Sequence, residues 1–166
     1  ALYTPAGLRL GVSAARGEWI EDSVLVLIPE RERDKSAQTV IGADAELGLG
    51  HWLVRGEVLR SAFEIPFEFS PAASPLVAWS SFVSARYRWH PRWQVAARAE
   101  RLDFTSLTGS NGVPVEWDAP VTRVEAVVGF RVTRPIEIRA GWQHNWRDGG
   151  RVHERGYPAL QVLYWF

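Results

Sequence analysis

Apolar and polar residues alternate with a period of two along most of the chain, which is typical of β-strands whose two faces meet different surroundings. Helical spacing, with apolar residues at i, i+3, i+4 and i+7, is missing. The alternation predicts eight strands, near 7–14, 40–49, 51–59, 78–89, 93–100, 123–132, 136–146 and 157–166.

The connections between these strands alternate in length. Short turns are expected at 50–51, 90–92 and 133–135, and long polar loops near 17–37, 64–75, 104–119 and 147–156. Short turns at one end, long loops at the other and an even strand count are typical of outer-membrane barrels. The pattern therefore predicts an all-β chain forming one domain over residues 1–166. The expected fold is an antiparallel up-and-down transmembrane β-barrel of eight strands, either closed alone or forming part of a larger barrel.

Aromatic residues gather at the predicted strand ends, where indole rings meet lipid headgroups in membrane proteins. The aromatics that we assign to the membrane interface are Trp52, Trp79, Trp89, Trp93, Trp142, Trp146 and Trp165. The alternative is a soluble barrel or sandwich, which would pack its aromatics inside.

The opposite face of the predicted strands is charged, and nearly all its bases are Arg. Arg forms forked pairs with carboxylates and suits partly enclosed ion networks, so we expect this face to line a lumen. The residues predicted to face the lumen are Arg9, Asp44, Glu46, Arg55, Glu57, Arg86, Arg88, Arg98, Glu100, Arg123, Glu125, Arg131, Glu137 and Arg139. In a wide barrel their Arg residues would favour anions, whereas in a narrow one the near-balanced charges would form a plug.

The short turns fix the expected register of two hairpins. Pairing Leu49 with Trp52 sets Glu46 opposite Arg55, and the turn at 133–135 sets Arg131 opposite Glu137; both are favourable cross-strand pairs. The first register also sets Asp44 beside Glu57, so we expect an Arg from a neighbouring strand to bridge these carboxylates.

Composition narrows the function classes. The net charge is zero and the pI is about 7.2, which gives no sign of nucleic-acid binding. The absence of Cys excludes disulfides, thiolate metal sites and a cysteine nucleophile. The absence of Met favours a processed chain or a fragment, since a mature exported protein has lost its signal peptide. The longest uncharged stretch, 69–85, contains Pro and several Ser and is no transmembrane helix.

Catalytic and metal sites find little support in the sequence. The candidates for an outer-rim catalytic group are His144 and His153, beside Asp148 and Glu154, with Ser106 and Ser110 elsewhere in the chain. Asp103, Asp118 and Asp148 are loop carboxylates better explained by solvation than by cation binding. We predict no catalytic residue, no metal, no cofactor and no enzymatic activity.

The last residues, "LQVLYWF", resemble the C-terminal signal of bacterial outer-membrane β-barrels, with Tyr164 and Phe166 in the signal positions. The stretches "GHWLVRGEVLRS", "RAERLDF" and "WDAPVTRVEAVVGFRVTR" are similar to the C-terminal half of larger porin-like proteins, distantly of the phosphate-selective type.

This resemblance implies an integral protein of the bacterial outer membrane that gives small polar or anionic solutes a passive path. Its implied partners are the lipid bilayer, lipopolysaccharide, the barrel-assembly machinery at the C-terminal strand, and further copies or further barrel strands. A sealed eight-strand barrel with a structural, adhesive or lipid-organising role is the alternative, and a lipid-modifying outer-membrane enzyme is the third reading.

Overall fold

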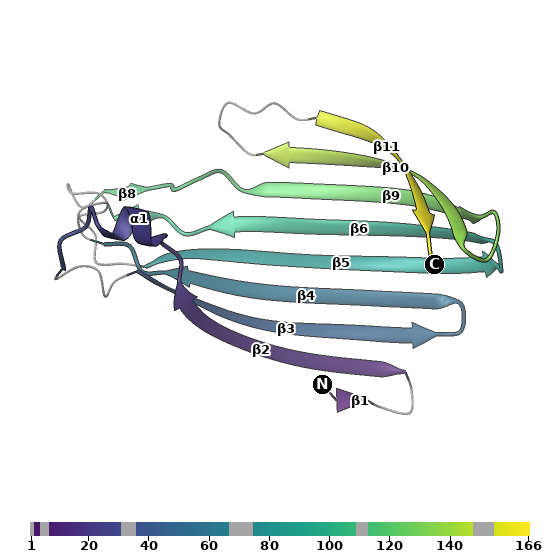
Figure 1. Cartoon of the computed structure of the whole chain (residues 1–166), viewed down its shortest axis with the longest axis horizontal. Coiled ribbons are helices and arrows are strands. Elements are labelled where there is room, and N and C mark those ends of the chain that lie inside the picture. The colour runs from purple at the N-terminus through teal and green to yellow at the C-terminus, as the bar shows by residue number, and fades with distance from the viewer. Residues whose placement is uncertain (1, 4–6, 31–35, 67–74, 109–112, 148–154) are drawn as a thin grey trace.

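The main feature of the computed structural model is one antiparallel sheet whose strands lie side by side in chain order (Figure 1). The structure describes residues 2–3, 7–30, 36–66, 75–108, 113–147 and 155–166. The eight predicted strands are confirmed as β2 (Leu8–Glu18), β3 (Ala37–Leu49), β4 (Trp52–Phe63), β5 (Leu76–His90), β6 (Trp93–Phe104), β9 (Val121–Arg131), β10 (Ile136–Arg147) and β11 (Arg155–Tyr164).

Small elements accompany these strands. β1 (Leu2–Tyr3) pairs with the edge of β2, and β7 (Leu107–Thr108) pairs with β8 (Pro114–Val115). One helical turn, α1 (Asp22–Leu25), lies in the first long connection, where the alternation predicted no helix. No helix in the described ranges has the length and apolar character needed to cross a membrane.

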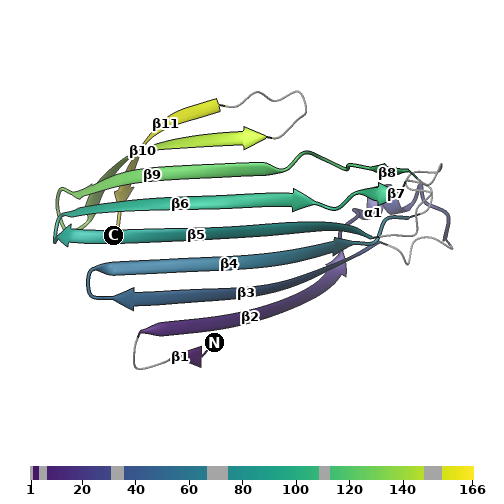
Figure 2. The same ribbon diagram turned by 180° about the vertical axis from the view of Figure 1, so that it is seen from behind.

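The two ends of the sheet differ as the connection lengths predict. One end carries the short turns, and the other carries α1, β7 and β8, as the two views show (Figures 1 and 2). At the turn between β3 and β4, Gly50 has a φ of 55°, a left-handed conformation that glycine adopts without steric cost. We call these the short-turn end and the long-loop end.

The sheet is not closed in this structure. The strand order begins with β1 beside β2 and finishes with β11, and within the described residues no pairing joins β11 to β2. The structure therefore establishes an open eight-strand meander, and closure into a barrel stays a prediction.

The sheet is a single layer with little hydrophobic core. The accessible surface of the whole chain is 11698 Å², whereas a folded soluble chain of this mass exposes about 8,300 Å². The buried apolar residues gather at the long-loop end and are Ile20, Ile28, Leu76, Val77, Ala78 and Ala119. Along the strands, Val12 is 89% exposed, Leu160 75% and Val162 65%. These side chains share one face, which we call the apolar face, and no described part of the chain covers it.

Candidate functional site on the polar face

The other face of the sheet collects all fourteen residues that were predicted to face a lumen, and we call it the polar face. Paired residues on neighbouring strands share a face, and residues two apart along a strand do so too. One row crosses the sheet through the pairs of Arg55 with Ser84, Ser84 with Arg98, and Arg98 with Glu125. The structure brings these side chains together on one surface, and whether that surface lines a lumen stays a prediction.

Both predicted hairpin registers are confirmed. Glu46 pairs with Arg55 and forms an ion pair with it, and Arg131 lies opposite Glu137 with 3.8 Å between Nη2 and Oε2. Opposite charges placed directly across two strands stabilise the pairing by roughly 0.2–1 kcal/mol.

The expected Arg bridge between Asp44 and Glu57 is wrong. The two carboxylates are cross-strand partners as predicted, but neither forms an ion pair with an Arg in the described part of the chain. Asp44 instead lies over Gly11 on β2, where a Cβ atom would clash with the carboxylate. The side chain of Asp44 thus leans toward β2, into the space above Gly11, and away from Glu57 on β4.

A first ion network lies toward the long-loop end. Glu100 accepts contacts from Arg98 Nη2 at 2.8 Å and from Arg123 Nη1 at 2.7 Å. Arg123 Nε also donates to Asn145 Oδ1 at 2.7 Å, and the Arg98 guanidinium stacks on the Phe82 ring at 4.1 Å from its centroid. These contacts tie β5, β6, β9 and β10 together through side chains.

A second cluster lies toward the short-turn end around Glu137, which is only 4% exposed. Arg139 Nε and Gln94 Nε2 both donate to its Oε1, each at 2.6 Å. A Cβ on Gly129 would lie 3.0 Å from Gln94 Cγ and 3.2 Å from Glu137 Oε1, so glycine leaves room for this contact. Gln94 was not among the predicted site residues, although its polar position in the alternation is a signal for it.

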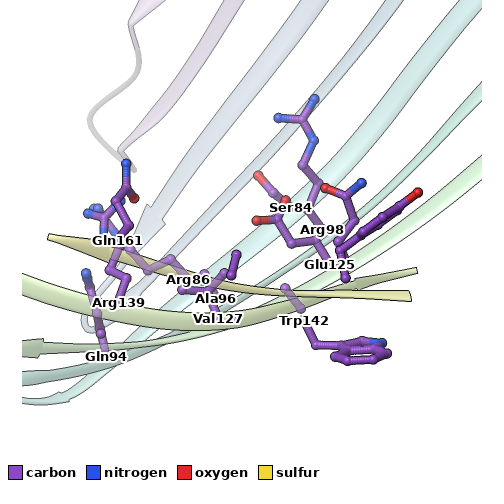
Figure 3. Close-up of a pocket in the computed structure, with 16 residues that line it drawn as sticks. Ser84, Arg86, Gln94, Ala96, Arg98, Glu125, Val127, Arg139, Trp142 and Gln161 are labelled. Atoms are coloured by element: carbon purple, nitrogen blue, oxygen red, sulfur yellow. The ribbon is translucent and has the colours of Figure 1, made fainter. Parts of the chain in front are cut away.

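An open pocket of about 350 Å³ lies between the two clusters (Figure 3). Its floor is made of small or apolar side chains on neighbouring strands, Ala96, Val127, Gly141 and Ala159. Its polar lining includes Arg86, Arg98, Arg139, Glu125, Gln94 and Gln161. With Gln143, three guanidinium groups and three amides surround one carboxylate, which gives a surface that favours an anion.

The charges of the polar face are unevenly distributed along the strands. Within the first five positions from the short-turn end lie Arg9, Glu46, Arg55, Arg86, Arg88, Arg131, Glu137 and Arg139. Further along the strands lie Asp44, Glu57, Arg98, Glu100, Arg123 and Glu125. Among the fourteen predicted residues the first group therefore has a net charge of +4 and the second of −2. Arg147 and Arg155 also lie on this face near the long-loop end and bring the second group to zero. The near balance of the whole set conceals this basic belt at the short-turn end.

Six of the seven predicted interface aromatics lie on strands, on the apolar face, and five of these six are near a strand end. Trp52, Trp89 and Trp93 are at the short-turn end, where Trp52 stacks on Tyr87 with 4.5 Å between ring centroids. Trp79 and Trp146 are toward the long-loop end. The exceptions are Trp142, which lies midway along β10, and Trp165, which follows β11.

The predicted assembly-signal residues lie at the end of the last strand. Tyr164 pairs with Ile136 on the apolar face, and its ring lies 6.3 Å from that of Phe166. Trp165 N donates to Pro135 O, which holds the tail against the last short turn. The signal role itself stays a prediction.

The weaker chemical candidates have structural partners. His144 contacts Trp146 on the apolar face with the two rings tilted at 54°, Asp103 pairs with Arg101, and Asp118 pairs with Arg147. Ser106 is exposed between β6 and β7, and Asp148, His153, Glu154 and Ser110 lie outside the described residues. Across the described ranges there is no group of three potential metal-binding side chains.

The Asp118 contact has an electrostatic consequence. The hydrogen bond donated by the Arg147 side chain, with a second from the Ala119 backbone N–H, holds the pKa of the Asp118 carboxyl below its ordinary value. The contact ties the connection after β8 to the end of β10.

Comparison of the chain with protein-family models, with curated proteins and with solved structures finds no match.

Proposed function

We propose that this chain is an integral β-barrel protein of a bacterial outer membrane and that its polar face gives small anionic solutes a passive, porin-like path. The observation that carries the proposal is the division of the sheet into an exposed apolar face and a charged polar face. In water the apolar face would be an unusually large exposed patch, whereas in a bilayer it would need no covering.

The register across the strands supports closure of the sheet edges. The row of paired residues that begins at Leu8 passes through Leu47, Val54, Ala85, Ala97, Ala126 and Trp142 and reaches β11 at Pro158. Phe166 lies eight positions beyond Pro158, so pairing the short-turn ends of β2 and β11 sets Phe166 opposite Leu8. An offset of eight residues over eight strands corresponds to a strand tilt of about 35°, which is typical of barrels.

That closing register also matches the two faces. It sets Val162 opposite Val12 and Tyr164 opposite Leu10 on the apolar face, and Gln161 opposite Ser13 on the polar face. β1 already pairs with Arg9 and Leu10, which shows that this edge accepts an antiparallel strand; closure requires β1 to leave those two positions.

The basic belt would make the path favour anions over cations. Rings of Arg or Lys in a pore lower the barrier for anions. Six Arg and two Glu lie near the short-turn end, and Arg86 and Arg139 extend from this belt into the pocket. An eight-strand interior is filled by side chains, so a conducting path requires a wider barrel, formed when the edges pair between chains.

Single-channel recording in planar bilayers tests this function. We expect stable steps of conductance, with a reversal potential in a salt gradient that shows anion preference. Arg86→Glu should weaken or invert that preference, while Arg123→Gln, at the other end of the polar face, should change it less. Insertion without conductance steps would contradict the path and favour the sealed barrel, and an unchanged preference in Arg86→Glu would contradict the basic belt.

A further inference from the structure

Charged residues on the apolar face occur only near the long-loop end of the described strands. On this face the positions from the short-turn end upward are uncharged until Arg16 on β2, Arg60 on β4 and Arg101 on β6. Glu18, Glu64 and Asp103 lie at or beyond that level. An apolar face that is charged along one border only implies that its two borders meet different surroundings.

In a barrel whose strands tilt by about 35°, the three Arg residues would stand at one height. Eight residues separate Leu8 from Arg16, Trp52 from Arg60, and Trp93 from Arg101. At a rise of about 3.3 Å per residue and a tilt of about 35°, each guanidinium stem would begin roughly 21 Å above the reference residue of its strand at the short-turn end. This separation is close to the height of a barrel's apolar band, about 25 Å, so the Arg side chains reach the headgroup level.

Arg60 and Arg101 are arranged around one patch. Arg60 pairs with Trp79 on β5, and Arg101 pairs with Ser81, the next residue of β5 on the same face. Strand spacing and rise put the Cα atoms of the two Arg residues about 12 Å apart, so both side chains can reach one group lying over Trp79 and Ser81. Thr122, opposite Arg101, adds a hydroxyl to this patch.

Two of these guanidinium groups are ion-paired, so the net positive charge of the patch comes from Arg60. Arg16 Nη2 contacts Glu64 Oε1 at 2.9 Å. Arg101 Nε donates to both Asp103 carboxylate oxygens at 2.9 Å, and its Nη2 contacts Asp103 Oδ1 at 2.8 Å. Arg60 has no acidic partner within the described part of the chain. An Arg beside a Trp on an apolar face is a point where an anion gains a charge-assisted hydrogen bond close to the hydrocarbon.

A shallow groove of about 640 Å³ lies closer to the short-turn end than the patch. Ala85, Ala97 and Ala126 form one row of small side chains across its floor, and Trp52, Tyr87 and Trp142 border it. Ala97 is four residues below Arg101 on the same face of β6. A groove of alanines beneath a cationic patch matches the shape of a lipid, with an acyl chain below and an acidic headgroup above.

We propose that Arg60 and Arg101 bind the phosphate of an anionic lipid in the leaflet at the long-loop end, with an acyl chain of that lipid along the alanine groove. The inference rests on the proposed membrane insertion but does not depend on a conducting path. It assigns a lipid partner to the outer surface of the barrel, on the face opposite the basic belt.

The test uses the full chain folded in zwitterionic detergent and titrated with phosphatidylglycerol or with phosphatidylcholine. We expect phosphatidylglycerol to bind more tightly, and we expect Arg60→Gln together with Arg101→Gln to weaken its binding by about tenfold or more. Arg60→Lys with Arg101→Lys should keep most of the binding because the charge remains. Arg9→Gln, on the polar face, is the matched control and should leave binding unchanged.

The outcomes separate this inference from the proposed function. Equal affinity for the two lipids, or unchanged phosphatidylglycerol binding in the double Gln variant, would overturn the lipid site while leaving insertion intact. Failure of the wild-type chain to insert into phosphatidylcholine vesicles would overturn the membrane proposal itself. Circular dichroism of each variant shows whether a loss of binding reflects the site or the fold.

Discussion

Glycine residues on the polar face hold the space that neighbouring charged side chains occupy. Asp44 lies over Gly11, and the contact between Gln94 and Glu137 passes over Gly129. A Cβ at Gly11 would displace the Asp44 carboxylate, and a Cβ at Gly129 would require Gln94 to shift by a few tenths of an ångström. The positions of the polar side chains on this face therefore depend on the glycines that leave room for them as well as on the charged residues themselves.

The contact between Asp118 and Arg147 predicts a pH dependence confined to the long-loop end. A carboxyl whose folded pKa is lowered stabilises the fold above its unfolded pKa, and that contribution is lost as the pH falls through the folded pKa. We expect hydrogen exchange at the Ala119 amide, which donates to Asp118 Oδ1 at 2.8 Å, to lose protection when the pH is lowered from about 5 to about 2. Exchange is compared with the intrinsic rate at each pH.

Asp118→Asn and Arg147→Gln are the controls for this prediction. Both should show reduced protection at pH 5 and a smaller change on acidification. Equal protection at the two pH values in the wild-type chain would mean that the ion pair does not hold this connection in place.

At the scale of one strand, β9 offers neighbouring positions that face opposite sides. Val128 is on the apolar face and Val127 is in the pocket floor on the polar face. If the apolar face meets lipid, Val128→Arg should lower the free energy of unfolding by about 2–4 kcal/mol at mid-depth. Val127→Arg should cost less, because its guanidinium enters a polar, hydrated surface.

Denaturant unfolding of both variants in lipid vesicles measures this difference. Equal costs at the two positions would contradict the assignment of the faces, and a larger cost at Val127 would reverse it. The comparison is matched because the substitution, the strand and the depth are nearly the same.

The strands were predictable from the sequence because alternation continues through their centres, but their ends were not. β4 extends to Phe63 and β3 begins at Ala37, beyond the predicted segments, because backbone pairing continues where the alternation fades. α1 and β7 are formed inside loops that carry no periodic signal.

The polar face was predictable as a set of residues but not as a charge distribution. The total of eight Arg and six acids is nearly balanced, and only the register shows that six of the Arg lie near one end. The Asp44 arrangement was missed for a related reason, since a strand pattern gives the partner of a residue but not the direction in which its side chain leans.

At the scale of the whole molecule, the barrel has eight strands if β2 and β11 of one chain pair with each other, and more than eight if they pair between chains. The closing register sets Val12 on β2 opposite Val162 on β11, and the chain has no Cys, so an introduced pair reports without background. We expect Val12→Cys with Val162→Cys to form a disulfide between chains, seen as a dimer on a non-reducing gel, because a conducting path requires more than eight strands.

Each single Cys variant is the control, since neither should give that dimer in the same yield. A disulfide within one chain would instead establish the sealed eight-strand barrel. The absence of any disulfide would mean that the edges pair in another register or with other strands.

The central claim is that lipid covers the apolar face and water covers the polar face. Single Cys substitutions at Val124, Glu125, Ala126, Val127 and Val128 in lipid vesicles, treated with a charged maleimide, test it most directly. We expect rapid labelling at 125 and 127 and protection at 124, 126 and 128 that is lost in urea. Equal labelling along β9, or protection at 125 and 127 instead, would contradict the account.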